Sequence, residues 1–199
     1  MGEIEGFWKW FLANREQLHS SAYNDEALLD EVGEALHLVD VRFAFEIGPP
    51  EAIREFVISA DGLKDVFPSV VSLVSAAPNI PQWKINAFRP RRTLLPSVEL
   101  NGYSVDPEDV SFSLLDDSEI AGIHLFLPNF REENVTLKQI GYLLLDSALG
   151  EFDVEMNLGL IKMLDVSSPE EFKRYPFSEL PEMFDRLNER LGRQPVIAH

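Results

Sequence analysis

Apolar residues recur at helical spacing along the start of the chain. The stretch FWKWFLANREQLHS carries Phe7, Phe11 and Leu18 on one side of a helix. A second apolar stripe runs through DEALLDEVGEALHLV, and Asn24 can cap this helix at its start. We therefore expect two helices in the N-terminal segment 1–39.

The period of the pattern changes to two after Asp40. VRFAFEI, REFVISADG and WKINAF each alternate apolar with polar residues, as half-buried strands do. Between the second and third of these stretches, apolar residues recur at helical spacing and predict a helix. Asp65 is its expected cap, and Pro68 lies in its first turn. Segment 40–92 is thus predicted to form a strand–strand–helix–strand (ββαβ) unit.

The same order of elements returns after a connector. SVELNGYSV, in the connector 93–108, predicts a hairpin about its Asn-Gly turn. DVSFSLLDD and GIHLFLP predict two strands, VTLKQIGYLLLDSALG a helix, and FDVEMNLGLIKML one long strand. These elements form a second predicted ββαβ unit over 109–165.

The tail, 166–199, is expected to be helical. Ser168 opens the sequence Ser-Pro-Glu-Glu, which has the form of a capping box with proline at the first helical position. Ser178 can start a last helix, which Gly192 closes.

Neither ββαβ unit can bury both faces of a three-stranded sheet by itself. We therefore predict an α+β fold in which the two units join into one mostly antiparallel sheet, with ferredoxin-like elements and internal pseudo-twofold symmetry. The N-terminal and C-terminal helices are expected to pack on this sheet. The whole chain, 1–199, is expected to be a single domain, and a pair of smaller domains is the alternative.

Composition narrows the chemistry that the chain can perform. Apolar residues make up 45% of the sequence, enough to fill a core. The chain has no cysteine, which excludes disulfides, thiolate nucleophiles and cysteine-bound metals. No apolar run approaches the roughly 20 residues that a membrane-spanning helix needs. The acidic start also differs from a signal peptide, so we expect a soluble cytoplasmic protein.

Charge bears on the choice of partner. The formal net charge of -17 argues against nucleic acid and against anionic membranes as partners. Segment 41–92 is mildly basic by contrast, because it holds seven Lys and Arg against five Asp and Glu.

Three arginines, Arg89, Arg91 and Arg92, follow the third predicted strand. Arginine suits bidentate binding of carboxylate or phosphate, so these side chains can form a site for an anionic ligand, together with Asp61. Alternatively, they pair with carboxylates of the protein itself. We favour internal pairing, because the acid-rich segment 93–137 follows directly.

Motifs for catalysis or cofactor binding are missing from the sequence. None of the four histidines has a second histidine at metal-ligand spacing, and the acidic stretch DPEDVSFSLLDDSE lacks the spacing of an EF-hand. The sequence contains no nucleophile elbow, no phosphate-binding loop and no dinucleotide fingerprint. Asp61, in ISADG, is expected to form a turn. We expect no cofactor and no metal, and we favour a protein without catalytic activity over an enzyme.

The aromatic cluster Phe7, Trp8 and Trp10 is a candidate contact surface. Successive residues of a helix are about 100° apart, so these rings cannot all face the core. Packing on the sheet is the default for them. Trp8 is expected to lie outside the apolar stripe, and an exposed tryptophan would favour a protein–protein contact.

The stretches FWKWF, VISADG and WKINAFRPR resemble a family of uncharacterised bacterial proteins, and the resemblance spans most of the chain. It implies a bacterial, cytoplasmic protein. Because the family has no assigned activity, the resemblance gives no catalytic residue.

Three functions fit these observations. The favoured one is an acidic protein–protein interaction module without catalytic activity, which binds another protein or itself. The alternative is a binder of, or enzyme on, a small anionic ligand held by the arginine cluster. A mimic of nucleic-acid charge ranks last, because basic residues interrupt the acids of the C-terminal part.

Overall fold

The computed structural model describes residues 2–22, 25–116, 119–169 and 172–193. The chain divides into two compact units, residues 1–89 and residues 90–198, and each unit is described by itself. The fold is α+β, and four of its six strand pairings are antiparallel among the described residues. These residues form three separate sheets rather than the single sheet that we predicted.

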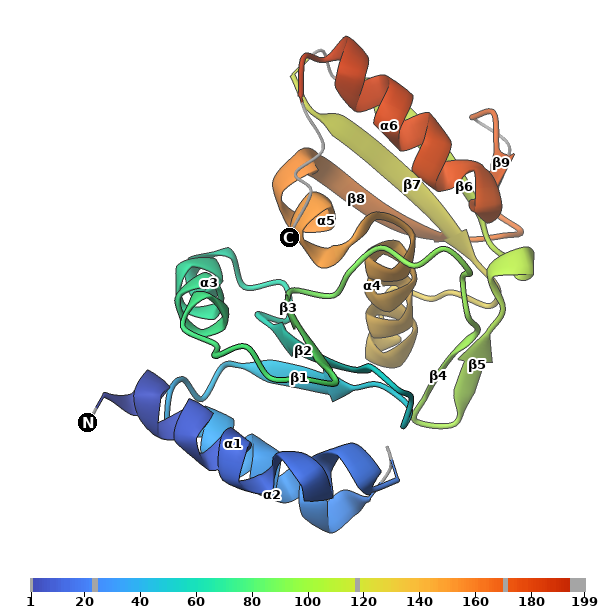
Figure 1. The fold of residues 1–199 in the computed structure, drawn as a ribbon. Helices are drawn as coiled ribbons and strands as arrows, with labels where there is room; N and C mark the ends of the chain where they lie inside the picture. The colour runs from blue at the N-terminus through green and yellow to red at the C-terminus, as the bar shows by residue number, and fades with distance from the viewer. Residues whose placement is uncertain (1, 23–24, 117–118, 170–171, 194–199) are drawn as a thin grey trace. The chain divides into compact units, whose positions relative to one another are not determined.

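The first unit places two N-terminal helices against a three-stranded sheet (Figure 1). Its elements, with η for a 3-10 helix, are α1 Glu3–Ser20, α2 Glu26–His37, β1 Ala44–Ile47, β2 Arg54–Ser59, η1 Lys64–Val66, α3 Phe67–Ser75 and β3 Trp83–Ala87. The central strand β2 pairs antiparallel with β1 and parallel with β3. Helix α3 connects these two parallel strands, and the sequence pattern predicted a helix at this place in the chain.

Two predicted helix caps are wrong. The carboxylate of Asp25 caps α2 by accepting from the Leu28 N–H at 3.4 Å, whereas Asn24 lies outside the described residues. Asp65 lies inside η1, and the N-cap of α3 is Val66, which makes no side-chain cap. Pro68 does occupy the first turn of α3.

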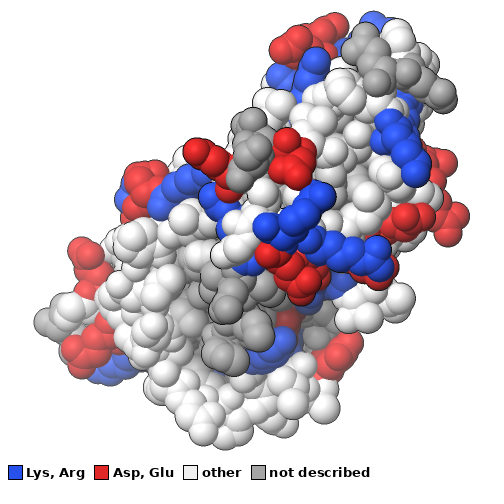
Figure 2. All heavy atoms as spheres, turned by 90° about the horizontal axis from the view of Figure 1, so that it is seen from above, with Lys and Arg blue, Asp and Glu red and all other residues white. Residues whose placement is uncertain are grey.

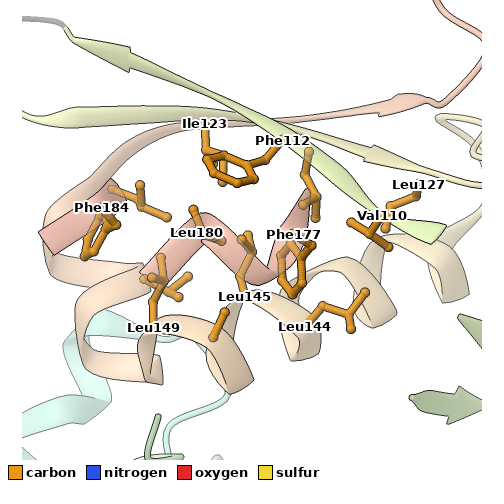
Figure 3. Packing of buried hydrophobic residues seen from close by; sticks show 14 of the residues in the cluster. Val110, Phe112, Ile123, Leu127, Leu144, Leu145, Leu149, Phe177, Leu180 and Phe184 are labelled. Atoms are coloured by element: carbon orange, nitrogen blue, oxygen red, sulfur yellow. The ribbon is translucent and has the colours of Figure 1, made fainter. Parts of the chain in front are cut away.

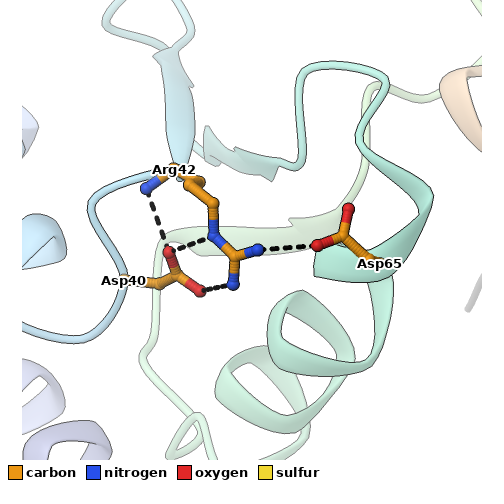
Figure 4. A network of polar contacts seen from close by, with 3 residues as sticks. All are labelled: Asp40, Arg42 and Asp65. Atoms are coloured by element: carbon orange, nitrogen blue, oxygen red, sulfur yellow. Dashed lines mark hydrogen bonds and ion pairs between the residues drawn. The ribbon is translucent and has the colours of Figure 1, made fainter.

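Strand β1 begins three residues later than predicted because Asp40, Arg42 and Asp65 form a polar network (Figure 4). The Asp40 carboxylate accepts from the backbone N–H of Arg42 at 3.0 Å and from its guanidinium at 2.9 and 2.7 Å. The guanidinium also donates to Asp65 at 2.7 Å. This turn replaces strand pairing at Arg42, and the hydrogen bonds from Arg42 lower the pKa of Asp40 to about 2.

The core of the first unit is aromatic. The rings of Phe7 and Phe11 lie 6.3 and 5.1 Å from the ring of Phe56 on β2. The Trp8 indole N–H donates to the carbonyl of Leu73 at 2.8 Å, which joins α1 to the end of α3. These contacts hold α1 on the face of the sheet that carries Phe56.

The second unit contains a hairpin and a four-stranded sheet. Its elements are β4 Val98–Leu100, β5 Tyr103–Val105, η2 Pro107–Asp109, β6 Ser111–Asp116, β7 Ala121–Leu127, α4 Val135–Leu149, α5 Glu151–Asn157, β8 Leu158–Asp165, β9 Tyr175–Pro176, η3 Phe177–Glu179 and α6 Leu180–Arg190. The larger sheet has the order β8-β7-β6-β9, with β7 parallel to β8 and antiparallel to β6. The predicted Asn-Gly hairpin is confirmed, with positive φ at Asn101 and Gly102.

The long strand predicted from FDVEMNLGLIKML is wrong in its first half. Residues 151–157 form helix α5, and strand β8 begins only at Leu158. Gly150, with φ of 87°, ends α4 and redirects the chain into α5. Within α5, the side-chain amide of Asn157 donates to Asp153 one turn earlier, at 2.7 Å. The apolar residues of this stretch suit a strand and a helix equally well over so few positions.

The helix predicted at Ser168 is not formed in the described part of the tail. Ser168, Pro169 and residues 172–174 are not helical, and Glu170 and Glu171 lie outside the described residues. The Arg174 guanidinium instead donates to the carbonyls of Val166 and Ser168 at 2.8 and 2.6 Å, which folds this segment back on itself.

The core of the second unit lies between the sheet and helices α4 and α6 (Figure 3). Phe112 and Ile123 project from the strands toward Leu145 of α4 and Leu180 of α6. Burial of such side chains stabilises a domain by about 1.5–3 kcal/mol each. On the other face of the sheet, Arg174 stacks on Phe126, with its guanidinium carbon 3.8 Å from the ring centre.

Candidate functional site

The arginine cluster of the sequence separates into side chains with different partners. Arg89, whose side chain is 13% exposed, donates to Glu46 at 2.6 Å and to Asp61 at 3.2 Å. Phe88, with φ of 70°, bends the backbone directly before it. Asp61, which we expected beside the arginines, is thus a partner of Arg89 within the first unit.

Arg91 pairs within the second unit. Its guanidinium makes a bidentate contact with Asp185, at 2.8 and 2.9 Å, and lies 3.8 Å from Asp153. Its Nε also donates to the Leu149 carbonyl at 3.4 Å. The hydrogen bond to Asp185 raises the pKa of Arg91, although burial opposes this change.

Asp153 is a buried carboxylate within this network. Burial raises its pKa, while the Asn157 amide and the charge of Arg91 act in the opposite direction. The Asn157 carbonyl in turn accepts from Arg193 at 3.1 Å. The network therefore ties helix α5 to α6 and to the segment that follows α6, which is a structural role.

Arg92 contributes a backbone contact, because its N–H donates to the carbonyl of Ser147 at 2.8 Å. Glu46, Asp61, Asp153 and Asp185 all lie outside the acid-rich segment 93–137, so that segment is not the source of these partners. Their sequence separations from the arginines explain why sequence reasoning did not find them.

The aromatic candidates do not form an exposed patch. Trp8 is 4% exposed and Phe7 is 3% exposed, so both belong to the core, and Trp10 is half-buried. The expectation that Trp8 lies outside the apolar stripe is wrong. Its indole N–H finds a carbonyl acceptor at the end of α3, which allows the whole ring to be buried.

Arg54 is a buried residue that sequence reasoning missed. It is 1% exposed, and its guanidinium donates to the carbonyls of Gly48 and Ser21, at 2.8 and 2.9 Å, and to that of Leu18. These acceptors are carbonyls rather than carboxylates, so burial lowers the pKa of Arg54. The side chain satisfies carbonyl groups at the end of α1 and is structural.

A groove in the second unit runs along the free edge of strand β8. It has a volume of about 480 Å³ and is lined by Phe130, Glu132, Lys138, Tyr142, Ile161, Lys162, Met163, Leu164, Asp165 and Ser168. Residues 161–165 are consecutive in β8, and alternate residues of a strand point to opposite faces of the sheet. A cavity that touches all five must therefore lie beside the strand. β8 is an outer strand of its sheet, and no strand of the described residues pairs with this side of it.

Helix α4 forms the opposite wall of this groove. Lys138 and Tyr142 are one helical turn apart and line the same side of α4. Gly141 lets strand and helix approach closely, because a Cβ at this position would lie 2.6 Å from the Met163 sulfur. No signal in the sequence marks this groove, since it exists only once α4 packs beside β8.

No helix within the described residues is long and apolar enough to cross a membrane. In the same part of the chain, no three His, Asp or Glu side chains lie together as a metal site would require.

The comparisons with known proteins give no relative. No family model, no curated protein and no solved structure matches the chain. The resemblance to an uncharacterised bacterial family therefore stays a prediction.

Proposed function

We propose that this protein is an interaction module without catalytic activity, and that it binds another polypeptide in the groove between α4 and β8. The observation that carries the proposal is the lining of the groove by five consecutive residues of an outer strand. An outer strand presents unpaired N–H and C=O groups that a second chain can use. Addition of a strand to such an edge is a common mode of peptide recognition, with pockets beside the strand for alternate side chains.

Charge supports a protein as the partner. The net charge of -17 opposes binding to nucleic acid and to anionic membranes. On the face drawn in Figure 2, acidic and basic side chains are interspersed, which fits a mimic of nucleic-acid charge poorly. We place the module in the bacterial cytoplasm, as the resemblance to a bacterial family implies.

A library of displayed random peptides tests this function. The full chain is immobilised, bound peptides are enriched, and the affinity of each enriched peptide for the chain in solution is measured by calorimetry. We expect peptides with dissociation constants of about 1–100 μM, as for a small interface. If no enriched peptide binds in solution, the proposed function is wrong.

The alternative function, a site for a small anionic ligand at Arg89, Arg91 and Arg92, has less support. Arg89 and Arg91 already hold carboxylates of the protein, at 2.6 to 3.2 Å. A ligand would have to displace these partners. A thermal-shift screen against anionic metabolites decides the question, because a shift that disappears in the Arg89→Ala/Arg91→Ala variant would establish the site.

We also propose that the two units repeat one ββαβ pattern. In the first unit, β2 pairs antiparallel with β1 and parallel with β3, and α3 connects β2 to β3. In the second unit, β7 pairs antiparallel with β6 and parallel with β8, and α4 lies between β7 and β8 in the chain. A ferredoxin-like arrangement of both units within one sheet has no support, because their strands belong to separate sheets.

A further inference from the structure

We infer that the partner is an extended segment of another protein, in which apolar and acidic side chains alternate, and that it adds to the free edge of β8 as a new strand. This inference rests on the proposed function and specifies the chemistry of its partner. Two features of the groove lead to it: the exposed Lys162 on β8 and the apolar wall.

The two lysines of the groove are available for an acidic partner. Lys84 of the first unit pairs with Glu55 at 3.5 Å, whereas no carboxylate of the described residues pairs with Lys138 or Lys162. Lys138 is half-buried and Lys162 is exposed, on opposite walls of the groove. On a strand added to β8, an acidic side chain beside Lys162 would complete an ion pair that the described residues leave open. Lys138, on α4, lies on the other side of that strand.

The two carboxylates of the groove do not cancel this preference. Asp165 accepts from the backbone N–H of Ser167 at 2.8 Å and from the Ser167 hydroxyl, and these bonds lower its pKa. Its charge is thus already met by donors in the turn after β8. Glu132 is exposed on the loop that precedes α4, whereas Lys138 and Tyr142 lie within that helix.

The apolar wall sets the other half of the pattern. Ile161 and Met163 pack against the core from β8, and Phe130 and Tyr142 line the same groove. A strand added to β8 alternates its side chains between the two faces of the sheet. Apolar residues would therefore face α4, and the residues between them would lie on the face that carries Lys162.

A second copy of this chain fits the groove less well. Antiparallel pairing of β8 with itself about its centre places the two Lys162 side chains opposite or diagonal to each other. Like charges in these positions destabilise a sheet. The net charge of -17 opposes the approach of a second copy and of any acidic partner alike, and at physiological ionic strength it is screened beyond about 8 Å.

Defined probes test the inference directly. The probe is an acetylated, amidated peptide of alternating Val and Glu, eight residues long to match β8. Two control peptides replace Glu by Ser or by Lys. Calorimetry measures binding to the full chain, and amide chemical shifts locate the bound peptide.

We expect the Val-Glu peptide to bind about threefold more tightly than the Val-Ser peptide, as one exposed ion pair with Lys162 allows. Amide shifts should change in residues 158–165 and in the first turns of α4. The Lys162→Glu variant should bind the Val-Glu peptide about fivefold more weakly. The matched control is Lys9→Glu, which changes the charge equally on the exposed side of α1 and should bind as the wild type does.

Several outcomes would overturn the inference. Equal affinity for the Val-Glu and Val-Lys peptides would remove the acidic preference. Shifts confined to residues outside β8 and α4 would place binding elsewhere, and a dimer joined at β8 would make a second copy the occupant. Failure of all three probes would also reject this partner, while a peptide enriched from the random library that binds in solution would leave the proposed function standing.

Discussion

At the scale of single residues, arginines act mainly as internal clamps. Arg89 and Arg91 hold carboxylates, Arg54 holds carbonyls, and Arg42 joins two aspartates that are far apart in the sequence. In a chain with twice as many acids as bases, each arginine has many possible carboxylate partners. Which of them it meets depends on tertiary structure, so the effects of mutating these residues follow from their contacts.

Arg42 controls the ionisation of Asp40. The guanidinium of Arg42, followed by its backbone N–H, lowers the pKa of Asp40 from 3.8 to about 2. The Arg42→Gln variant keeps the N–H and should therefore return this pKa part of the way toward 3.8. The folded wild-type protein binds the carboxyl proton of Asp40 more weakly than the unfolded chain does. The ionised Asp40 carboxylate therefore gives its full contribution to stability above pH 3.8, and this contribution is lost as the pH falls toward 2. An NMR titration of the Asp40 carboxyl carbon measures the change, and an unaltered midpoint in the variant would contradict the network.

Arg54 should be among the most sensitive positions of the first unit. The Arg54→Ala variant leaves the carbonyls of Leu18, Ser21 and Gly48 without this donor. We expect the free energy of unfolding to fall by about 3 kcal/mol, as for loss of buried hydrogen bonds to a charged group. Urea unfolding followed by fluorescence measures it. The control is Arg15→Ala, an exposed arginine of α1, for which about 0.5 kcal/mol or less is expected.

At the scale of elements, the close approach of α4 to β8 shapes the groove. The approach depends on Gly141, because a Cβ there would lie 2.6 and 2.7 Å from the sulfur and terminal methyl of Met163. These atoms form the far end of a flexible side chain, so they can move aside. Met163 lines the groove, so its displaced end can move into that space.

The Gly141→Ala variant should therefore fill the groove without unfolding the protein. Alanine adds about 1 kcal/mol of helix propensity, which offsets part of the packing cost. We expect stability to change by less than about 1 kcal/mol and binding of the Val-Glu peptide to weaken about tenfold. Adding Met163→Ala removes the displaced side chain and should restore part of the binding, because the groove then lacks one apolar contact of its wall. Unchanged affinity in Gly141→Ala would show that the peptide does not occupy this part of the groove.

At the scale of the whole molecule, the division into two units raises the question of cooperativity. All three tryptophans, Trp8, Trp10 and Trp83, belong to the first unit, so their fluorescence reports on that unit, whereas circular dichroism reports on both. The units have separate sheets, and the core of the second lies within that unit. We expect the two signals to give different midpoints in urea. Coincident transitions would instead favour the single domain that the sequence pattern predicts.

The sequence by itself determined the α+β class, the position of most helices and strands, and the Asn-Gly hairpin. These features depend on local periodicity and on turn residues, which the chain carries within each element. Local patterns failed at Glu151–Asn157, where the apolar residues fit both helix and strand, and at Asp65, whose carboxylate pairs with distant Arg42 instead of capping a helix. Only the tertiary structure decided how strands divide among sheets, which carboxylates Arg89 and Arg91 meet, and where a groove opens. Each of these depends on contacts between residues far apart in the chain, and no local pattern encodes the distance between them.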